Sequence, residues 1–105
     1  VCQDVNMKKA PRNLGQEKLG WTFLSNHGHV LLCLYMQPEQ SLRDIASRVG
    51  ITERAVHRIL SDLESEGYLT REREGRRNRY TFELDKKLRH PIEAHVKIRS
   101  LLKLV

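Results

Sequence analysis

Five hydrogen-bonding side chains fall within a short stretch of the sequence: Thr52, Glu53, Arg54, His57 and Arg58. Because helix residues three and four apart are neighbours, Arg54, His57 and Arg58 would form one outward stripe. A guanidinium fork matches the two acceptors on the major-groove edge of guanine, and a carboxylate matches the amine of cytosine. Thr52 would bring the positive end of a helix dipole close to a phosphate. The stripe is therefore suited to contact nucleic-acid bases and backbone.

Three of these side chains also have a simpler interpretation. Arg58 could form an ion pair with Asp62, four residues further along the same helix. His57 could be an ordinary surface residue. Glu53 could repel phosphates instead of accepting a hydrogen bond from a base. The residue types alone leave these alternatives open.

The stripe lies on the second of two expected helices that are joined by a tight turn. The segment LRDIASRVGITERAVHRIL, residues 42–60, places small and branched residues on one side of the first helix: Ile45, Ala46 and Val49. Gly50 can adopt the positive φ that a sharp turn requires, and Thr52 can cap the second helix. The apolar residues of the second helix recur at helical spacing: Val56, Ile59, Leu60 and Leu63. This pattern predicts a helix-turn-helix.

After Gly67 the apolar period changes from that of a helix to the alternation of a strand. Alternating residues flank a turn over residues 74–78, EGRRN: Leu69, Arg71 and Arg73 before it, and Tyr80, Phe82 and Leu84 after it. We expect a β-hairpin with Tyr80 and Phe82 in the core. Its basic residues could bind phosphates or enter a narrow minor groove: Arg71, Arg73, Arg76, Arg77 and Arg79. Alternatively, Arg71 and Arg73 could form cross-strand pairs with neighbouring glutamates.

Three segments are expected along the chain. Residues 1–20 are polar and lack periodicity, which predicts a flexible arm. Residues 21–85 hold an apolar helix near 29–36, the helix-turn-helix and the hairpin. Residues 86–105 form a basic connector and a final helix beginning at Pro91. That helix would expose an apolar patch, which favours a homodimer formed through the C-terminal helix, and the patch comprises Ile98, Leu101, Leu102 and Leu104. The alternative is that this helix closes the core of its own domain.

The order of helix, helix-turn-helix and basic hairpin resembles a known family. From Trp21 to Leu84 the chain is similar to the winged helix-turn-helix transcriptional regulators of bacteria and archaea, of the MarR-like and ArsR-like kind. The segments LRDIASRVGITERAVHRILSDLESEGYLTRE and GRRNRYTF carry the resemblance. It implies a mainly α fold with a small β-hairpin wing and a C-terminal helix. By position, it also implies residues that face the major groove and residues of the wing that contact DNA: Thr52, Glu53, Arg54, His57 and Arg58 for the groove, and Arg76, Arg77 and Arg79 for the wing.

The composition and the remaining motifs favour some classes of function and argue against others. The formal net charge of +6 favours an acidic partner such as double-stranded DNA. No two histidines form the i, i+4 pair of a metal-binding helix, so no metal or other cofactor is expected. Cys2 and Cys33 differ in their surroundings, which argues against a disulfide and fits a reducing cytoplasm. No enzymatic motif and no apolar run long enough to span a membrane is found.

These observations predict a cytoplasmic, dimeric, sequence-specific DNA-binding transcriptional regulator, a repressor that acts by occupying duplex DNA. Two other classes of function compete with it. The winged helix could be a protein interaction module whose basic wing docks on an acidic partner. It could also be a sensor whose DNA affinity responds to a ligand or metal. An outward helix face left uncovered by the last helix would favour DNA over a protein partner.

Overall fold

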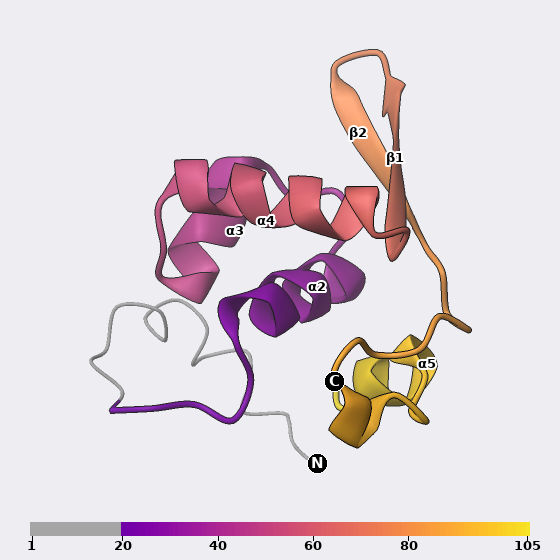
Figure 1. Cartoon of the computed structure of the whole chain (residues 1–105). Coiled ribbons are helices and arrows are strands. Elements are labelled where there is room, and N and C mark those ends of the chain that lie inside the picture. The colour runs from indigo at the N-terminus through magenta and orange to yellow at the C-terminus, as the bar shows by residue number, and fades with distance from the viewer. Residues whose placement is uncertain (1–19) are drawn as a thin grey trace.

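The structure is a computed structural model of the chain, and it describes residues 20–105. The expected arm over residues 1–20 thus lies almost wholly outside the described residues. The elements are α2 (Asn26–Met36), α3 (Leu42–Val49), α4 (Glu53–Ser65), β1 (Leu69–Glu74), β2 (Arg77–Phe82), a 3-10 helix (Pro91–Glu93) and α5 (Ile98–Leu102). Helix α2 lies under the α3–α4 pair, and the hairpin projects beyond the end of α4 (Figure 1). The mainly α fold with a small β-hairpin wing is confirmed.

Helix α2 is the central element of the core. Five consecutive residues of this helix are buried, Val30 to Leu34, as expected for a helix covered on more than one side. The Ser25 hydroxyl accepts from the Gly28 amide and caps the helix start. Burial raises the pKa of the Cys33 thiol, which keeps it protonated as a donor toward Gln40 Oε1 at 3.6 Å. Cys33 is therefore a packing residue of the core.

The helix-turn-helix forms where the sequence predicts it. Ser41 and Asp44 make a reciprocal capping box at the start of α3. Gly50 ends α3 with a φ of 90°, and both its amide and that of Ile51 donate to the Ala46 carbonyl. The Thr52 hydroxyl then accepts from the Ala55 amide at 3.0 Å and caps α4. The inner side of α4 is buried through the four residues expected: Val56, Ile59, Leu60 and Leu63.

The wing is a two-stranded antiparallel hairpin with a tighter turn than expected. The register pairs Leu69 with Phe82 at the base and Glu74 with Arg77 at the tip. The turn is therefore only residues 75–76, and residues 77 and 78 belong to β2 because the strand ladder continues to that point. Gly75 supplies the positive φ, 63°. Tyr80 is buried and Phe82 is half-buried against the core, as the alternation predicted.

The expected continuous helix from Pro91 to Leu104 is wrong. The chain forms only the 3-10 helix and the five-residue α5, with a turn between them. The physical reason is a non-local pairing, in which the Leu88 amide donates to the Val96 carbonyl and the Ile98 amide to the Lys86 carbonyl. These bonds hold the residues before α5 in an extended conformation that excludes a helix.

The expected apolar patch at the C-terminus is also smaller than the sequence indicated. Ile98 and Leu102 are each 2% exposed and belong to the core of α2, α3 and α4, whereas Leu104 is 64% exposed. To this extent the alternative, in which the segment closes its own core, is the correct one. In the part of the chain that the structure describes, no helix is long and apolar enough to cross a membrane.

The turn between α3 and α4 is a sensitive point of the fold. Replacing Gly50 with Ala is expected to lower the free energy of unfolding by about 1–2 kcal/mol, because a Cβ strains the left-handed conformation. Urea denaturation measures the change. Gly20→Ala is the matched control, since a Cβ there meets nothing within 4 Å. Equal stability of the two variants would contradict this account of the turn.

Candidate nucleic-acid interface

The outer face of α4 carries the predicted contact stripe. Arg54, His57 and Arg58 are all exposed, because Val56 and Leu60 anchor the opposite side of the helix in the core. Within residues 20–105, none of these three side chains forms a hydrogen bond or ion pair with another described residue. Their donors are therefore available to a partner outside the chain. The structure brings the stripe together as the spacing predicted.

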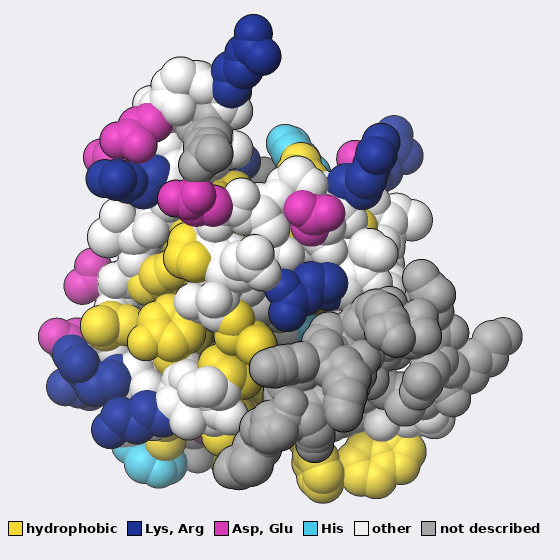
Figure 2. Space-filling view, turned by 180° about the vertical axis from the view of Figure 1, so that it is seen from behind, with side chains coloured by type: hydrophobic (Ala, Val, Ile, Leu, Met, Phe, Trp, Pro, Cys, Tyr) yellow, Lys and Arg dark blue, Asp and Glu magenta, His cyan; other side chains and the backbone are white. Residues whose placement is uncertain are grey.

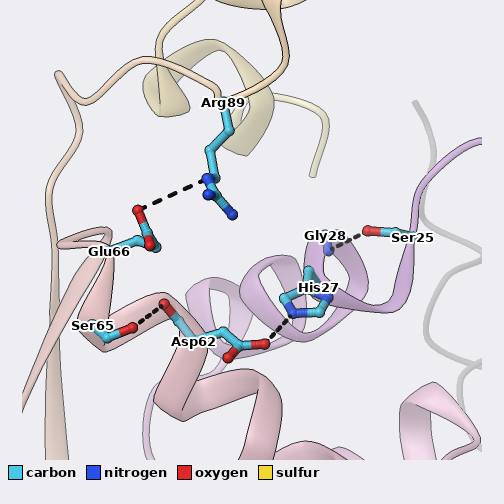
Figure 3. A network of polar contacts seen from close by, with 7 residues as sticks. All are labelled: Ser25, His27, Gly28, Asp62, Ser65, Glu66 and Arg89. Carbon is cyan, nitrogen blue, oxygen red and sulfur yellow. Dashed lines mark hydrogen bonds and ion pairs between the residues drawn. The ribbon is translucent and has the colours of Figure 1, made fainter.

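The alternative ion pair between Arg58 and Asp62 does not form. The Asp62 carboxylate instead lies 2.8 Å from His27 Nε2, which comes from the first turn of α2 (Figure 3). This contact joins α4 to α2. It also removes the intrahelical partner that the sequence offered to Arg58.

At the N-terminal end of α4, the side chains of Thr52 and Glu53 make different contacts. The Thr52 hydroxyl caps the helix, so its oxygen is already an acceptor from Ala55. Glu53 Oε2 lies 3.8 Å from Nε of Arg43, and both side chains are mostly exposed, which makes this a weak pair. Sequence reasoning missed Arg43, because its position beside α4 depends on the crossing of the two helices. The cation partly offsets the negative charge of Glu53 at this end of the interface.

The wing arginines do not form one uniform group. Arg76 is exposed at the tip and, among the described residues, has no ion-pair partner. Arg79 lies 3.6 Å from Glu74, and Arg73 donates to the Gly75 carbonyl at 3.1 Å. Arg77 is placed in β2 opposite Glu74. The tip thus offers Arg76 directly, while the pairs of Arg73 and Arg79 are exposed and can exchange for phosphate contacts.

Arg71 differs from the other wing arginines. Its Nη2 atom lies 3.0 Å from Oε1 of Glu64 on α4, and each side chain is 27% exposed. Neither of the sequence interpretations, a cross-strand pair or a phosphate contact, anticipated a partner on the helix. The residues lie seven positions apart in two different elements, so no local period indicated the pair.

The two basic regions share one side of the molecule. In the view from behind, Lys and Arg side chains lie at the tip of the hairpin and over the helix-turn-helix near the upper edge, and others lie lower on the same face and at its lower corner (Figure 2). Helix α5 lies on the far side of α2 from the outward face of α4 (Figure 1). The last helix therefore leaves the outward face uncovered. This is the arrangement that distinguishes a DNA-binding surface from the competing protein interaction module.

An open groove of about 690 Å³ lies on the other side of α4, between α2 and the C-terminal segment. Its floor is apolar, with Leu31, Leu63 and Ile98, and its rim includes His27 and Arg89. No group of three or more metal-binding side chains is present in residues 20–105.

This combination of folded elements and exposed basic surface defines a winged helix-turn-helix protein. The family model of the MarR family matches residues 25–77, and the chain belongs to that family. The MarR-like side of the resemblance is thereby confirmed. No curated protein matches the chain.

Solved structures show the same fold. The chain is similar to MepR, a transcription regulator of the Staphylococcus aureus multidrug efflux pump MepA, with 24% identity and a TM-score of 0.51. The similarity covers 93% of this chain and 61% of MepR, so the chain spans less than two thirds of that protein. It is also similar to the PcaV transcriptional regulator from Streptomyces coelicolor, solved with its natural ligand. Here the identity is 24%, the TM-score 0.52, and the coverage 94% of this chain and 72% of PcaV.

Proposed function

We propose that this protein is a cytoplasmic, sequence-specific DNA-binding transcriptional regulator, and that it represses by occupying duplex DNA. The observation that carries the proposal is the uncovered stripe of Arg54, His57 and Arg58, with the basic wing on the same side. Membership of the MarR family supports the same conclusion. The net charge of +6 favours a polyanion over a neutral partner.

In this proposal α4 enters the major groove with its N-terminal half. Arg54 and Arg58 lie one turn apart, so their guanidinium forks can reach neighbouring base pairs and donate to guanine O6 and N7. Glu53, already beside Arg43, can accept from a cytosine amine with less repulsion from the phosphates. Thr52 marks the helix N-terminus, where the dipole favours a phosphate.

The wing supplies affinity that depends little on sequence. Arg76 at the tip would contact a phosphate or enter the minor groove beside the site read by α4. Arg73, Arg77 and Arg79 would add cations along the same hairpin. Since each neutralised phosphate releases counterions, binding through these residues would weaken steeply with salt.

Replacing Arg54 with Ala is expected to cost about 1–3 kcal/mol on the preferred site and to relax discrimination at one base pair. The reason is the loss of a bidentate contact to guanine. Selection from a random-sequence library, followed by titration of single-base variants of the selected site, measures the effect. Arg99→Ala is the control, because Arg99 lies on α5. Full sequence discrimination by the Arg54 variant would rule out this role.

Replacing Arg76 with Ala is expected to weaken all duplexes alike. The slope of log K against log salt should flatten by about one unit, as expected for one lost phosphate contact. Fluorescence anisotropy with a labelled duplex across a salt series gives the slope. If the wild-type protein fails to bind any duplex at low salt, the proposed function itself is wrong.

The functional unit of the proposal is a homodimer, in which the two copies of α4, the recognition helices, meet two half-sites one or more duplex turns apart. Exposed apolar side chains near the C-terminus are available for the interface, including Ile92 and Leu104 at 78% and 64% exposure. Light scattering at micromolar concentration should give the mass of two chains, and Leu104→Asp should shift it toward one. A wild-type mass of one chain would exclude the dimer.

The groove between α2, the end of α4 and the C-terminal segment is what favours a ligand-responsive sensor as the second candidate. A molecule bound there would touch the same helix that presents Arg54 and Arg58. PcaV, whose structure is similar to this chain, was solved in complex with its natural ligand, and this supports a ligand-responsive sensor as the second candidate. A ligand-dependent shift in melting temperature together with a change in DNA affinity would support this second function.

A further inference from the structure

The ion pair between Arg71 and Glu64 is the contact that ties the wing to the recognition helix. Its atoms are 3.0 Å apart, and both side chains are 27% exposed. The pair of Arg79 and Glu74 within the hairpin is 3.6 Å long, with side chains 64% and 58% exposed. A shorter contact that is more shielded from water holds its geometry better, because screening is weaker there. Arg71 and Glu64 therefore fix the two elements more firmly than the surface pairs fix the strands.

Arg71 also marks the point along β1 where the wing leaves the body of the protein. Below it, Leu69 is 3% exposed, and opposite it Tyr80 is 8% exposed. Beyond it, residues 72–76 are all exposed. The ion pair is thus the outermost attachment of β1 among the described residues.

A small rotation at this attachment would move the tip a long way. Three residues of β1, 72–74, extend beyond Arg71 before the turn, and an extended strand rises roughly 3.3 Å per residue, so the end of β1 lies about 10 Å beyond the pair. A rotation of about 10° there displaces the tip of the wing by about 2 Å. This exceeds the tolerance of roughly 0.5 Å within which a contact stays productive.

We propose that Arg71 is a positioning residue: its ion pair with Glu64 fixes the angle of the wing against α4, so that both reach one DNA duplex together. This inference rests on the proposed function. In it, Arg71 does not touch DNA. It acts through the placement of Arg76, and Glu64 is its partner on the recognition helix.

The end of α4 offers a matched control. Glu66 lies two residues beyond Glu64 and forms a longer pair, 3.8 Å, with Arg89 of the connector (Figure 3). Removing either carboxylate takes one negative charge from the same end of the helix. Only the removal of Glu64 breaks a contact between α4 and the wing. If charge alone matters, both variants should bind DNA more tightly than the wild type. If the pair positions the wing, the loss of Glu64 should weaken DNA binding and the loss of Glu66 should not.

The experiment compares Glu64→Ala with Glu66→Ala in anisotropy titrations on one duplex. We expect Glu64→Ala to weaken binding at least about threefold, although it removes a carboxylate near DNA. Glu66→Ala should bind as tightly as the wild type or more tightly. The double variant Glu64→Arg with Arg71→Glu restores the pair at unchanged net charge and should recover most of the loss. Tighter binding by Glu64→Ala would overturn the proposal.

A second measurement needs no DNA. ¹⁵N relaxation of the free protein should show lower order parameters for residues 72–79 in Glu64→Ala, and unchanged values in Glu66→Ala. Unchanged order in both variants would overturn the positioning role. If the wild-type protein binds no duplex but the wing loosens only in Glu64→Ala, the proposed function fails while the attachment itself stands. The two failures are therefore distinguishable.

Discussion

The burial of one side of α4 is the constraint on which the rest of the structure depends. Val56 and Leu60 have no exposed surface, and they pack against α2 and α3. A helix anchored in this way can present only its opposite side to solvent. The orientation of Arg54 and Arg58 is thus set by residues that take no part in binding. The fully buried Val30 and Leu34 of α2 complete the surface against which α4 rests.

The positive and negative side chains of α4 lie toward opposite ends of the helix. The N-terminal half carries arginines that are unpaired within the described chain, whereas the C-terminal half and its cap residue carry three carboxylates, each held by a side chain from another element. These pairs are Asp62 with His27, Glu64 with Arg71, and Glu66 with Arg89. Arg71 and Arg89 therefore offset the negative charges of Glu64 and Glu66, which would otherwise repel a duplex. The three pairs also attach α4 to α2, to the wing and to the connector, so the same contacts serve both electrostatics and placement.

The sequence predicted the local features of this fold and missed the non-local ones. Gly50, Thr52 and the spacing from Val56 to Leu63 are signals within one turn or one helix, and the structure follows them. The final helix failed because the extended pairing of residues 86–88 with 96–98 overrides the helical preference of the apolar run. The predicted turn of the hairpin, residues 74–78, was also too long. Pairing between the strands, which is again non-local, continues to residues 74 and 77. The contacts of Arg43 and Arg71 with α4 depend on how α3 crosses α4 and on where β1 leaves the helix. A periodic pattern within one short segment carries no information on either.

The contact stripe on α4 contributes little to folding, which explains why it is free to serve binding. Exposed side chains without partners bury no surface, and substitutions at such positions usually change stability by less than about 0.5 kcal/mol. Arg54, His57 and Arg58 meet this description, whereas Arg71 does not, because its half-buried pair couples two elements. The basic surface therefore contains two kinds of arginine. One kind is exposed for a partner, and the other is held inside the protein to determine where the first kind can reach.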